Sequence, residues 1–117
     1  MASVLIVDDA AFMRTSLKMM LERNGFTVIG EADNGATAVQ KYMELNPNIV
    51  TMDITMPVLD GIEATKKIKE IDPKANIIIV SAMGQEVYVR DAVVAGAKNF
   101  IVKPFKEDHV VKVLSSL

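Results

Sequence analysis

The chain of 117 residues has no cysteine and no long apolar run. Without cysteine it has no disulfide framework, thiolate metal site or cysteine nucleophile, and it suits a reducing compartment. Its longest apolar runs have the length of a strand, far below the roughly 20 residues that cross a bilayer. The start, MASVLIVDD, lacks a charged segment and soon reaches acids, unlike a signal peptide. We therefore expect a cytoplasmic protein without membrane insertion.

The charge is also nearly balanced, with a formal net value of −2 at pH 7. Proteins that bind nucleic acid usually carry a basic patch or stripe, so we expect no direct DNA binding. Apolar residues make up 50% of the chain and charged residues 24%, which is typical of a globular protein. The length suits one domain over residues 1–117 that buries a single core.

Short apolar runs rich in valine and isoleucine alternate with segments of helical length. The runs are SVLIV (3–7), FTVIG (26–30), NIVTM (48–52), NIIIV (76–80) and NFIV (99–102). The first, third and fourth are nearly continuous in hydrophobicity, as in parallel strands that are covered on both faces. This order predicts an α/β domain of three layers, in which helices cover both faces of a doubly wound, five-stranded parallel sheet.

The segments between these runs carry apolar residues at helical spacing. Asn34 and Asp60 are expected to cap the N-termini of the second and third helices, and Gly96 to end the fourth. The second helix is predicted to bury Met43 together with Ala38, Val39 and Tyr42. The apolar spacing of the third helix includes Ile71, and the last helix carries Leu117 on one face with Val110 and Leu114.

Polar side chains follow four of the apolar runs at the point where each run ends. These residues are Asp8 and Asp9 after the first run, Asp53 after the third, Ser81 after the fourth and Lys103 after the fifth. The carboxyl ends of parallel strands meet at one edge of a sheet, where open α/β sheets bind ligands. Clustered carboxylates repel one another, which implies a compensating cation. Oxygen ligands without histidine or cysteine favour a hard ion, and Mg²⁺ fits best.

A carboxylate beside such an ion can itself accept a phosphoryl group and form an aspartyl phosphate. Asp53 is the natural acceptor because it stands alone after the central run, whereas the adjacent Asp8 and Asp9 are typical of a pair that holds metal. Lys103 supplies a mobile point charge, and the Ser81 hydroxyl can donate a hydrogen bond to the new phosphoryl group. The pattern therefore predicts a site that both accepts phosphate and triggers a change.

At these residues the chain resembles the response-regulator receiver domain family, and within it the single-domain chemotaxis regulators of the CheY type. The motifs are VDD (7–9), MDITMPVLDG (52–61), SAMG (81–84) and KPF (103–105), and the resemblance covers essentially the whole chain. It implies a flavodoxin-like sheet with strand order 2-1-3-4-5.

The resemblance also implies roles for individual residues. Asp53 would accept phosphate from a histidine kinase. Asp9 and Asp53 would bind Mg²⁺ directly, Asp8 mainly through water, and Thr55 through its backbone carbonyl. Ser81 and Lys103 would engage the phosphoryl oxygens. Phe100 would occupy the switch-aromatic position, with Phe in place of the frequent Tyr there, and Ser81 stands in place of the commoner Thr.

The implied partners are the histidine kinase, a downstream protein such as a flagellar motor switch component, and a phosphatase. The protein would not be an enzyme in the usual sense, since it would catalyse only its own aspartyl phosphorylation and dephosphorylation. A receiver domain that belongs to a larger regulator would show the same motifs.

Other functions remain open from the residues alone. A phosphohydrolase that acts through an aspartyl phosphate would usually need a second acid two residues after the nucleophile, where this chain has Thr55. A flavin-binding module would need a loop that cradles phosphate after the first strand, where Asp8 and Asp9 would repel it. A buried Asp53–Lys103 salt bridge without a ligand would leave the acid pair uncompensated.

Overall fold

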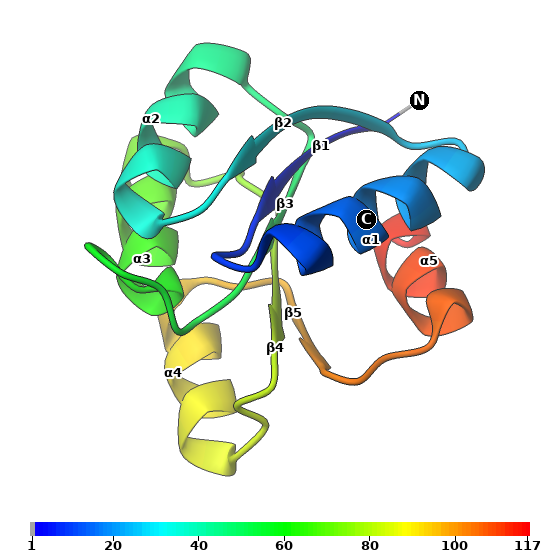
Figure 1. Ribbon diagram of the computed structural model, residues 1–117. Helices are drawn as coiled ribbons and strands as arrows, with labels where there is room; N and C mark the ends of the chain where they lie inside the picture. The colour runs from blue at the N-terminus through cyan, green and yellow to red at the C-terminus, as the bar shows by residue number, and fades with distance from the viewer. Residues whose placement is uncertain (1) are drawn as a thin grey trace.

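The computed structural model describes residues 2–117, in which five strands alternate with five helices (Figure 1). The strands are β1 (Ser3–Val7), β2 (Thr27–Ala32), β3 (Ile49–Met52), β4 (Ile77–Ser81) and β5 (Asn99–Val102). The helices are α1 (Ala11–Arg23), α2 (Gly35–Leu45), α3 (Gly61–Ile71), α4 (Glu86–Ala95) and α5 (Glu107–Ser115). None of the helices in this part of the chain has the length and hydropathy needed to cross a bilayer.

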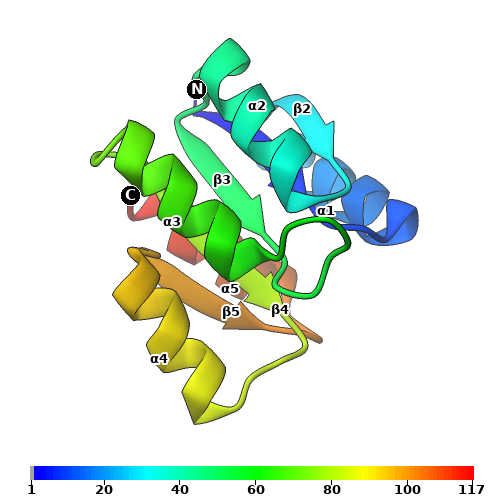
Figure 2. The ribbon, with the colours of Figure 1, turned by 90° about the vertical axis from the view of Figure 1, so that its left-hand side faces the viewer.

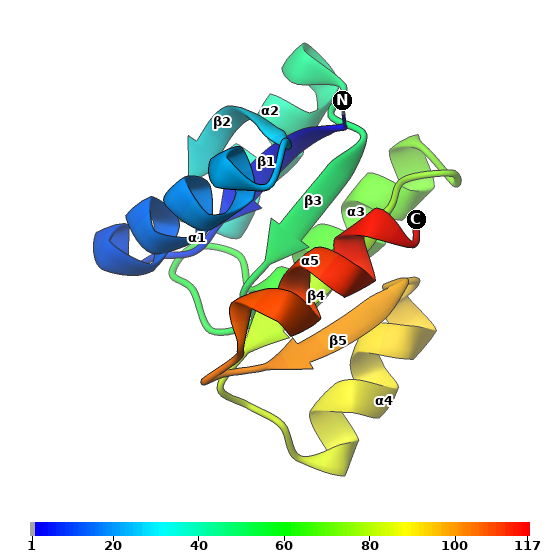
Figure 3. The same ribbon diagram turned by 90° about the vertical axis from the view of Figure 1, so that its right-hand side faces the viewer.

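All neighbouring strands pair in parallel, in the order β2-β1-β3-β4-β5. Helices α1 and α5 lie on one face of this sheet, and α2, α3 and α4 lie on the other (Figures 1, 2 and 3). The predicted three-layer α/β fold with strand order 2-1-3-4-5 is therefore confirmed.

The alternation of side chains along each strand divides the core into two parts. Leu5 and Val7 of β1 pack in the part that also holds residues of α2, α3 and α4. Val4 and Ile6 pack in the other part, with residues of α1 and α5. Every residue of β3 and β4 is buried, which explains why their sequences are nearly continuous in hydrophobicity.

The predicted helix caps are present. The side-chain oxygen of Asn34 accepts a hydrogen bond from the Thr37 amide at 2.9 Å, and Asp60 accepts one from the Glu63 amide at 2.9 Å. Gly96 follows α4 with a φ of 107°, a left-handed conformation that glycine adopts without steric strain.

The predicted burial of Met43 is wrong, since its relative accessibility is 57%. Ile71 and Leu117, which continue the apolar spacing of α3 and α5, are also exposed, with relative accessibilities of 50% and 40%. Met43 lies about 100° around the helix axis from the buried Tyr42, outside the stripe that faces the sheet. Ile71 is the last residue of α3, and Leu117 lies beyond the end of α5, so neither is followed by a further helical turn that could cover it.

Candidate functional site

The sheet brings the predicted polar residues to one edge. Strands β1, β3, β4 and β5 are neighbours in that order and run in the same direction. Asp8 follows β1, Asp53 follows β3, Ser81 ends β4 and Lys103 follows β5. The Asp53 amide donates to the Val7 carbonyl at 2.9 Å and the Lys103 amide to the Ser81 carbonyl at 2.9 Å, so the ladder extends into the site.

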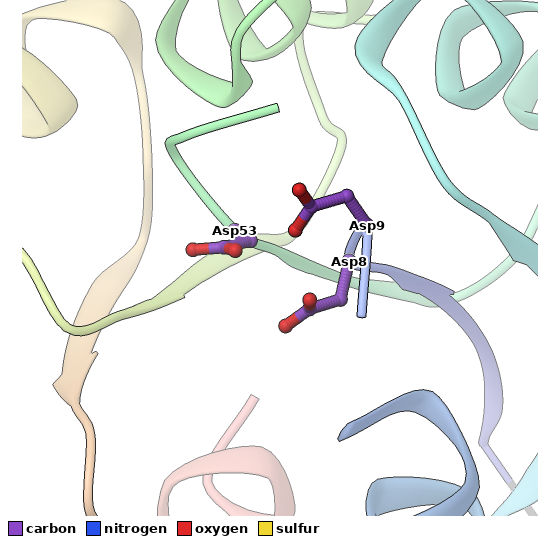
Figure 4. A group of neighbouring side chains, drawn as sticks. All are labelled: Asp8, Asp9 and Asp53. Carbon is purple, nitrogen blue, oxygen red and sulfur yellow. The ribbon is translucent and has the colours of Figure 1, made fainter. Parts of the chain in front are cut away.

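Asp8, Asp9 and Asp53 form a cluster in which one carboxylate oxygen of each lies within 4.8 Å of the others. Figure 4 shows the three side chains as neighbours, with the carboxylates of Asp8 and Asp9 directed to the side on which Asp53 lies. Asp8 and Asp53 are buried, with relative accessibilities of 2% and 8%, whereas Asp9 is exposed. The cluster is therefore buried at Asp8 and Asp53 and reaches solvent at Asp9.

Lys103 is the cation that pairs with this cluster. Its Nζ donates to Asp8 Oδ2 at 2.8 Å and lies 3.6 Å from Asp53 Oδ2. One ammonium group faces three carboxylates, so two formal negative charges of the cluster remain uncompensated when all three acids are ionised. A further cation would relieve this excess.

The electrostatic environment raises the pKa of Asp53. The main cause is burial, and the charges of Asp8 and Asp9 add to it. The Lys103 ammonium and the hydrogen bond that the Ile54 amide donates to Asp53 Oδ1 at 2.9 Å act in the opposite direction. Since the causes that raise the pKa prevail, the ionised form of Asp53 is less favourable in the folded protein without metal than it is for an aspartate in water.

The donor set fits a hard divalent ion such as Mg²⁺. The cluster offers carboxylate oxygens without histidine or cysteine, and Mg²⁺ is usually bound by one or two carboxylates together with water. Asp9 has an exposed carboxylate, and Asp53 can offer a second ligand. Thr55 lies in the exposed part of the β3–α3 connection, and the metal contact of its backbone carbonyl stays a prediction.

Ser81 and Phe100 occupy different places. Ser81 is buried at the same edge as the acids, and its Oγ accepts a hydrogen bond from the Met83 amide at 3.1 Å. The hydroxyl proton of Ser81 is still available to a further acceptor. Phe100 lies opposite Ile79 in β4, is half-buried, and packs on the part of the core that contains Ala92 of α4. The phenyl ring of Phe100 is therefore a packing group and not a member of the acid cluster.

Arg14 is a residue of the site region that the sequence reasoning missed. Its Nη1 donates to the backbone carbonyl of Asp8 at 2.7 Å, and its Nε donates to Glu31 Oε1 at 3.2 Å. The only signal in the sequence is a single cation in the first half of a helix that follows the acid pair. That signal is weak because many helices carry an isolated arginine toward solvent.

Comparison with known proteins identifies the family. Residues 4–115 match the model of the response regulator receiver domain. The chain belongs to this family, whose members take part in two-component signalling, and it is a receiver domain of the CheY type. The predicted resemblance is confirmed.

Several relatives have a chemotaxis function in their names. The chain is 60% identical to chemotaxis protein CheY of Bacillus subtilis over 112 residues, which are 96% of this chain and 93% of the relative. It is 59% identical to CheY of Thermotoga maritima over 114 residues, which are 97% and 95% of the two chains. A solved CheX–CheY–BeF3–Mg complex from Borrelia burgdorferi has a similar chain, with a TM-score of 0.94, 43% identity, and coverage of 98% of this chain and 87% of that one.

Proposed function

We propose that this protein is a phosphorylation-activated response regulator of chemotaxis, in which Asp53 accepts a phosphoryl group from the phosphohistidine of a histidine kinase. The observation that carries the proposal is the setting of Asp53. It is buried at the carboxyl edge of the sheet, shares a cluster with Asp8 and Asp9, and lies 3.6 Å from the Lys103 ammonium.

The proposed transfer forms one bond and breaks another. A carboxylate oxygen of Asp53 attacks phosphorus, and the bond between phosphorus and the histidine nitrogen of the kinase breaks. The nitrogen keeps the electron pair of that bond. Mg²⁺, when bound by Asp9 and Asp53 directly, by Asp8 mainly through water, and by the Thr55 carbonyl, supplies positive charge beside the phosphoryl oxygens.

The protein's own groups would then stabilise the product. Lys103, which contacts Asp8 and Asp53 before transfer, can turn its ammonium to a phosphoryl oxygen because Lys carries its charge on a flexible stem. The buried Ser81 hydroxyl can donate to another oxygen. The phosphoryl group adds a charge of about −1.5 to −2, which draws the Ser81 loop toward it.

Movement of this loop would change the face on which partners bind. In this proposal Phe100 is the switch aromatic. Its ring packs on the core next to α4 and can shift when the connection between β4 and α4 moves. The shift selects between inactive and active conformations that exist beforehand. A coupling free energy of about 1–3 kcal/mol is typical for such switches and would suffice here.

The proposal includes the partners and the location expected from the sequence. The histidine kinase supplies phosphate, a flagellar motor switch component is the downstream target, and a phosphatase resets the signal in the cytoplasm. Residues 1–117 act as one receiver domain that catalyses only its own phosphorylation and dephosphorylation. The chemotaxis names of the relatives from Bacillus subtilis and Thermotoga maritima support this pathway.

The test uses radiolabelled acetyl phosphate with and without Mg²⁺. We expect acid-labile labelling of the wild-type protein that requires Mg²⁺ and disappears in Asp53→Asn. Asp33→Asn is the matched control, since Asp33 also follows a strand, β2, at the same edge but lies outside the acid cluster. Undiminished labelling of Asp53→Asn would contradict the proposal, and multiple-turnover release of phosphate from small phosphoesters would favour the phosphohydrolase.

A further inference from the structure

Arg14, a residue of α1, links the β1–α1 connection at Asp8 to strand β2. From α1, its guanidinium reaches back to the β1–α1 connection and donates to the backbone carbonyl of Asp8 at 2.7 Å. The same group donates through Nε to Glu31 Oε1 on β2 at 3.2 Å. The planar fork of an arginine can hold both acceptors at once in a defined geometry.

The carbonyl that Arg14 holds belongs to the peptide that links Asp8 to Asp9. Because a peptide unit is planar, a fixed Asp8 carbonyl also fixes the direction of the Asp9 amide and the position of the Asp9 Cα. Asp9 is exposed, and within residues 2–117 no hydrogen bond or ion pair holds its carboxylate. The placement of this carboxylate therefore depends on the backbone.

Asp8 has its own supports, which makes Asp9 the sensitive member of the pair. Asp8 Oδ1 accepts from the Ala10 amide at 2.9 Å, and Asp8 Oδ2 accepts from Lys103 at 2.8 Å. The Asp8 amide also donates to the Ala32 carbonyl at 3.0 Å, which continues the ladder between β1 and β2. Beyond Asp9, the Ala10 carbonyl accepts a hydrogen bond from the Arg14 amide at 3.1 Å as α1 begins. Within the described residues, the carbonyl between Asp8 and Asp9 itself is held by the Arg14 guanidinium.

Arg14 is itself held firmly. Its side chain is partly buried, and its partner Glu31 lies within β2, whose backbone is paired with β1. The Glu31 carbonyl accepts a hydrogen bond from the Lys41 ammonium of α2. The contacts thus run from α2 through β2 and α1 to the peptide between the two acids.

From this geometry we infer that Arg14 is a positioning residue for metal binding: it aims the Asp9 carboxylate at the cluster without touching the metal. The inference rests on the proposed function, since it assigns a task within the same Mg²⁺ site. It differs from a stabilising role, because the Arg14–Glu31 pair is only partly buried, and ion pairs near the surface contribute little to folding, about 0–1 kcal/mol. The hydrogen bond to the Asp8 carbonyl gives Arg14 its specific effect.

The test compares Arg14→Met with Arg23→Met in the full chain. Arg23 lies at the other end of the same helix and also pairs with a glutamate, Glu107, so its loss removes a similar ion pair far from the acids along α1. Isothermal titration calorimetry with MgCl₂ alone gives the metal affinity. We expect Arg14→Met to weaken Mg²⁺ binding about tenfold, the lower end of the effect of removing a group that orients a metal ligand. Arg23→Met should leave this affinity unchanged.

Arg14→Lys separates position from charge. Lysine keeps the positive charge but cannot hold the Asp8 carbonyl and Glu31 with one planar fork, so we expect its Mg²⁺ affinity to stay below that of the wild type. Full affinity in Arg14→Lys would show that charge alone suffices and would overturn the inference. Amide NMR spectra should show that the Asp9 and Ala10 signals shift in the metal-free Arg14 variants and stay in place in Arg23→Met.

The remaining outcomes distinguish the inference from the function on which it rests. If the wild type binds Mg²⁺ and Arg14→Met binds it equally well, the inference is wrong while the proposed function stands. If the wild type itself binds no Mg²⁺, the proposed function fails and the inference fails with it. An Arg14→Met variant that loses thermal stability without a change in metal affinity would show a structural role only.

Discussion

Opposing electrostatic effects act on the carboxylate of Asp53. Burial and the charges of Asp8 and Asp9 raise its pKa, in spite of the Lys103 ammonium and the Ile54 amide. The residue that we propose as the phosphoryl acceptor is therefore one whose charged form destabilises the metal-free fold. Such a trade between stability and function is common at reactive sites.

The first prediction concerns the stability of Asp53→Asn without metal. A raised pKa in the folded state means that Asp53 favours folding only at acidic pH, and this contribution is lost as the pH rises through the folded-state pKa. Asparagine does not titrate, so the variant should unfold at a higher temperature than the wild type at neutral pH in EDTA. The difference should shrink as the pH falls toward the ordinary aspartate value of about 3.9.

Thermal unfolding followed by circular dichroism across this pH range measures the effect. Asp33→Asn serves again as the control and should show no such pH-dependent gain, since Asp33 is exposed. A variant Asp53→Asn that is less stable than the wild type at neutral pH in EDTA would mean that Lys103 stabilises the ionised acid more than burial and repulsion destabilise it.

Individual residues differ in how far the sequence predicts them. Asp8, Asp53, Ser81 and Lys103 could be placed together because each follows or ends a parallel strand, and the sheet leaves no other place for them. Arg14 could not be placed in this way. Its long side chain can point to solvent or back along the helix, and the choice depends on the Asp8 carbonyl and on Glu31, a residue of another strand.

The start of α3 shows how closely two elements are packed at the site. The Gly61 amide donates to the Ile54 carbonyl at 2.8 Å, and Asp60 caps the helix at the Glu63 amide. A Cβ atom added at Gly61 would lie 1.8 Å from the backbone oxygen of Asp53. The helix can begin at this point only because residue 61 has no side chain.

The second prediction therefore concerns Gly61→Ala. Its methyl group would clash with backbone that cannot turn aside as a side chain can, and we expect a loss of stability of about 1–3 kcal/mol, typical of overpacking. Because the clash falls on Asp53, labelling by acetyl phosphate should also slow. Chemical denaturation and the labelling rate are the two measurements.

Gly84→Ala is the matched control. Its Cβ would lie 3.1 Å from two methyl carbons of Val102, which is exposed and can shift. We expect a much smaller change in stability for this variant. If Gly61→Ala were as stable and as readily labelled as Gly84→Ala, the prediction would be wrong, because the start of α3 would then accommodate a methyl group beside the Asp53 carbonyl.

The elements themselves were largely predictable, because runs of valine and isoleucine and the caps Asn34 and Asp60 are local signals. The limits of the elements were less so. The second strand was expected over 26–30 but extends over Thr27–Ala32, since pairing with β1 holds the residues after Gly30. Local propensity does not contain that pairing.

At the scale of the whole molecule, the ammonium group of Lys103 connects segments that are far apart in the sequence. Lys103 follows the last strand, yet its ammonium contacts Asp8, 95 residues earlier, and Asp53. The order β1-β3-β4-β5 makes this possible, because the ends of β1 and β3 lie beside each other and only β4 lies between β3 and β5. The sequence indicates these strands, whereas the strand order came from the resemblance to the receiver family.

The third prediction follows from the two tasks that Lys103 performs in this arrangement. In EDTA it is the cation that compensates the acid cluster, so Lys103→Met should lower the thermal midpoint of unfolding. In Mg²⁺ the metal takes over part of this compensation and no longer meets the repulsion of the ammonium. Binding to the folded state stabilises it by about 2.7 kcal/mol at 100 times the dissociation constant.

The rise in midpoint on adding Mg²⁺ should therefore be larger for Lys103→Met than for the wild type. Lys98→Met is the control, since Lys98 is exposed just before β5 begins, at the opposite end of the same strand. That variant should respond to Mg²⁺ as the wild type does. If Mg²⁺ raised the midpoint of Lys103→Met by no more than that of the wild type, the ammonium and the metal would not share the same carboxylates. The acid cluster would then have to be balanced by charges elsewhere in the fold.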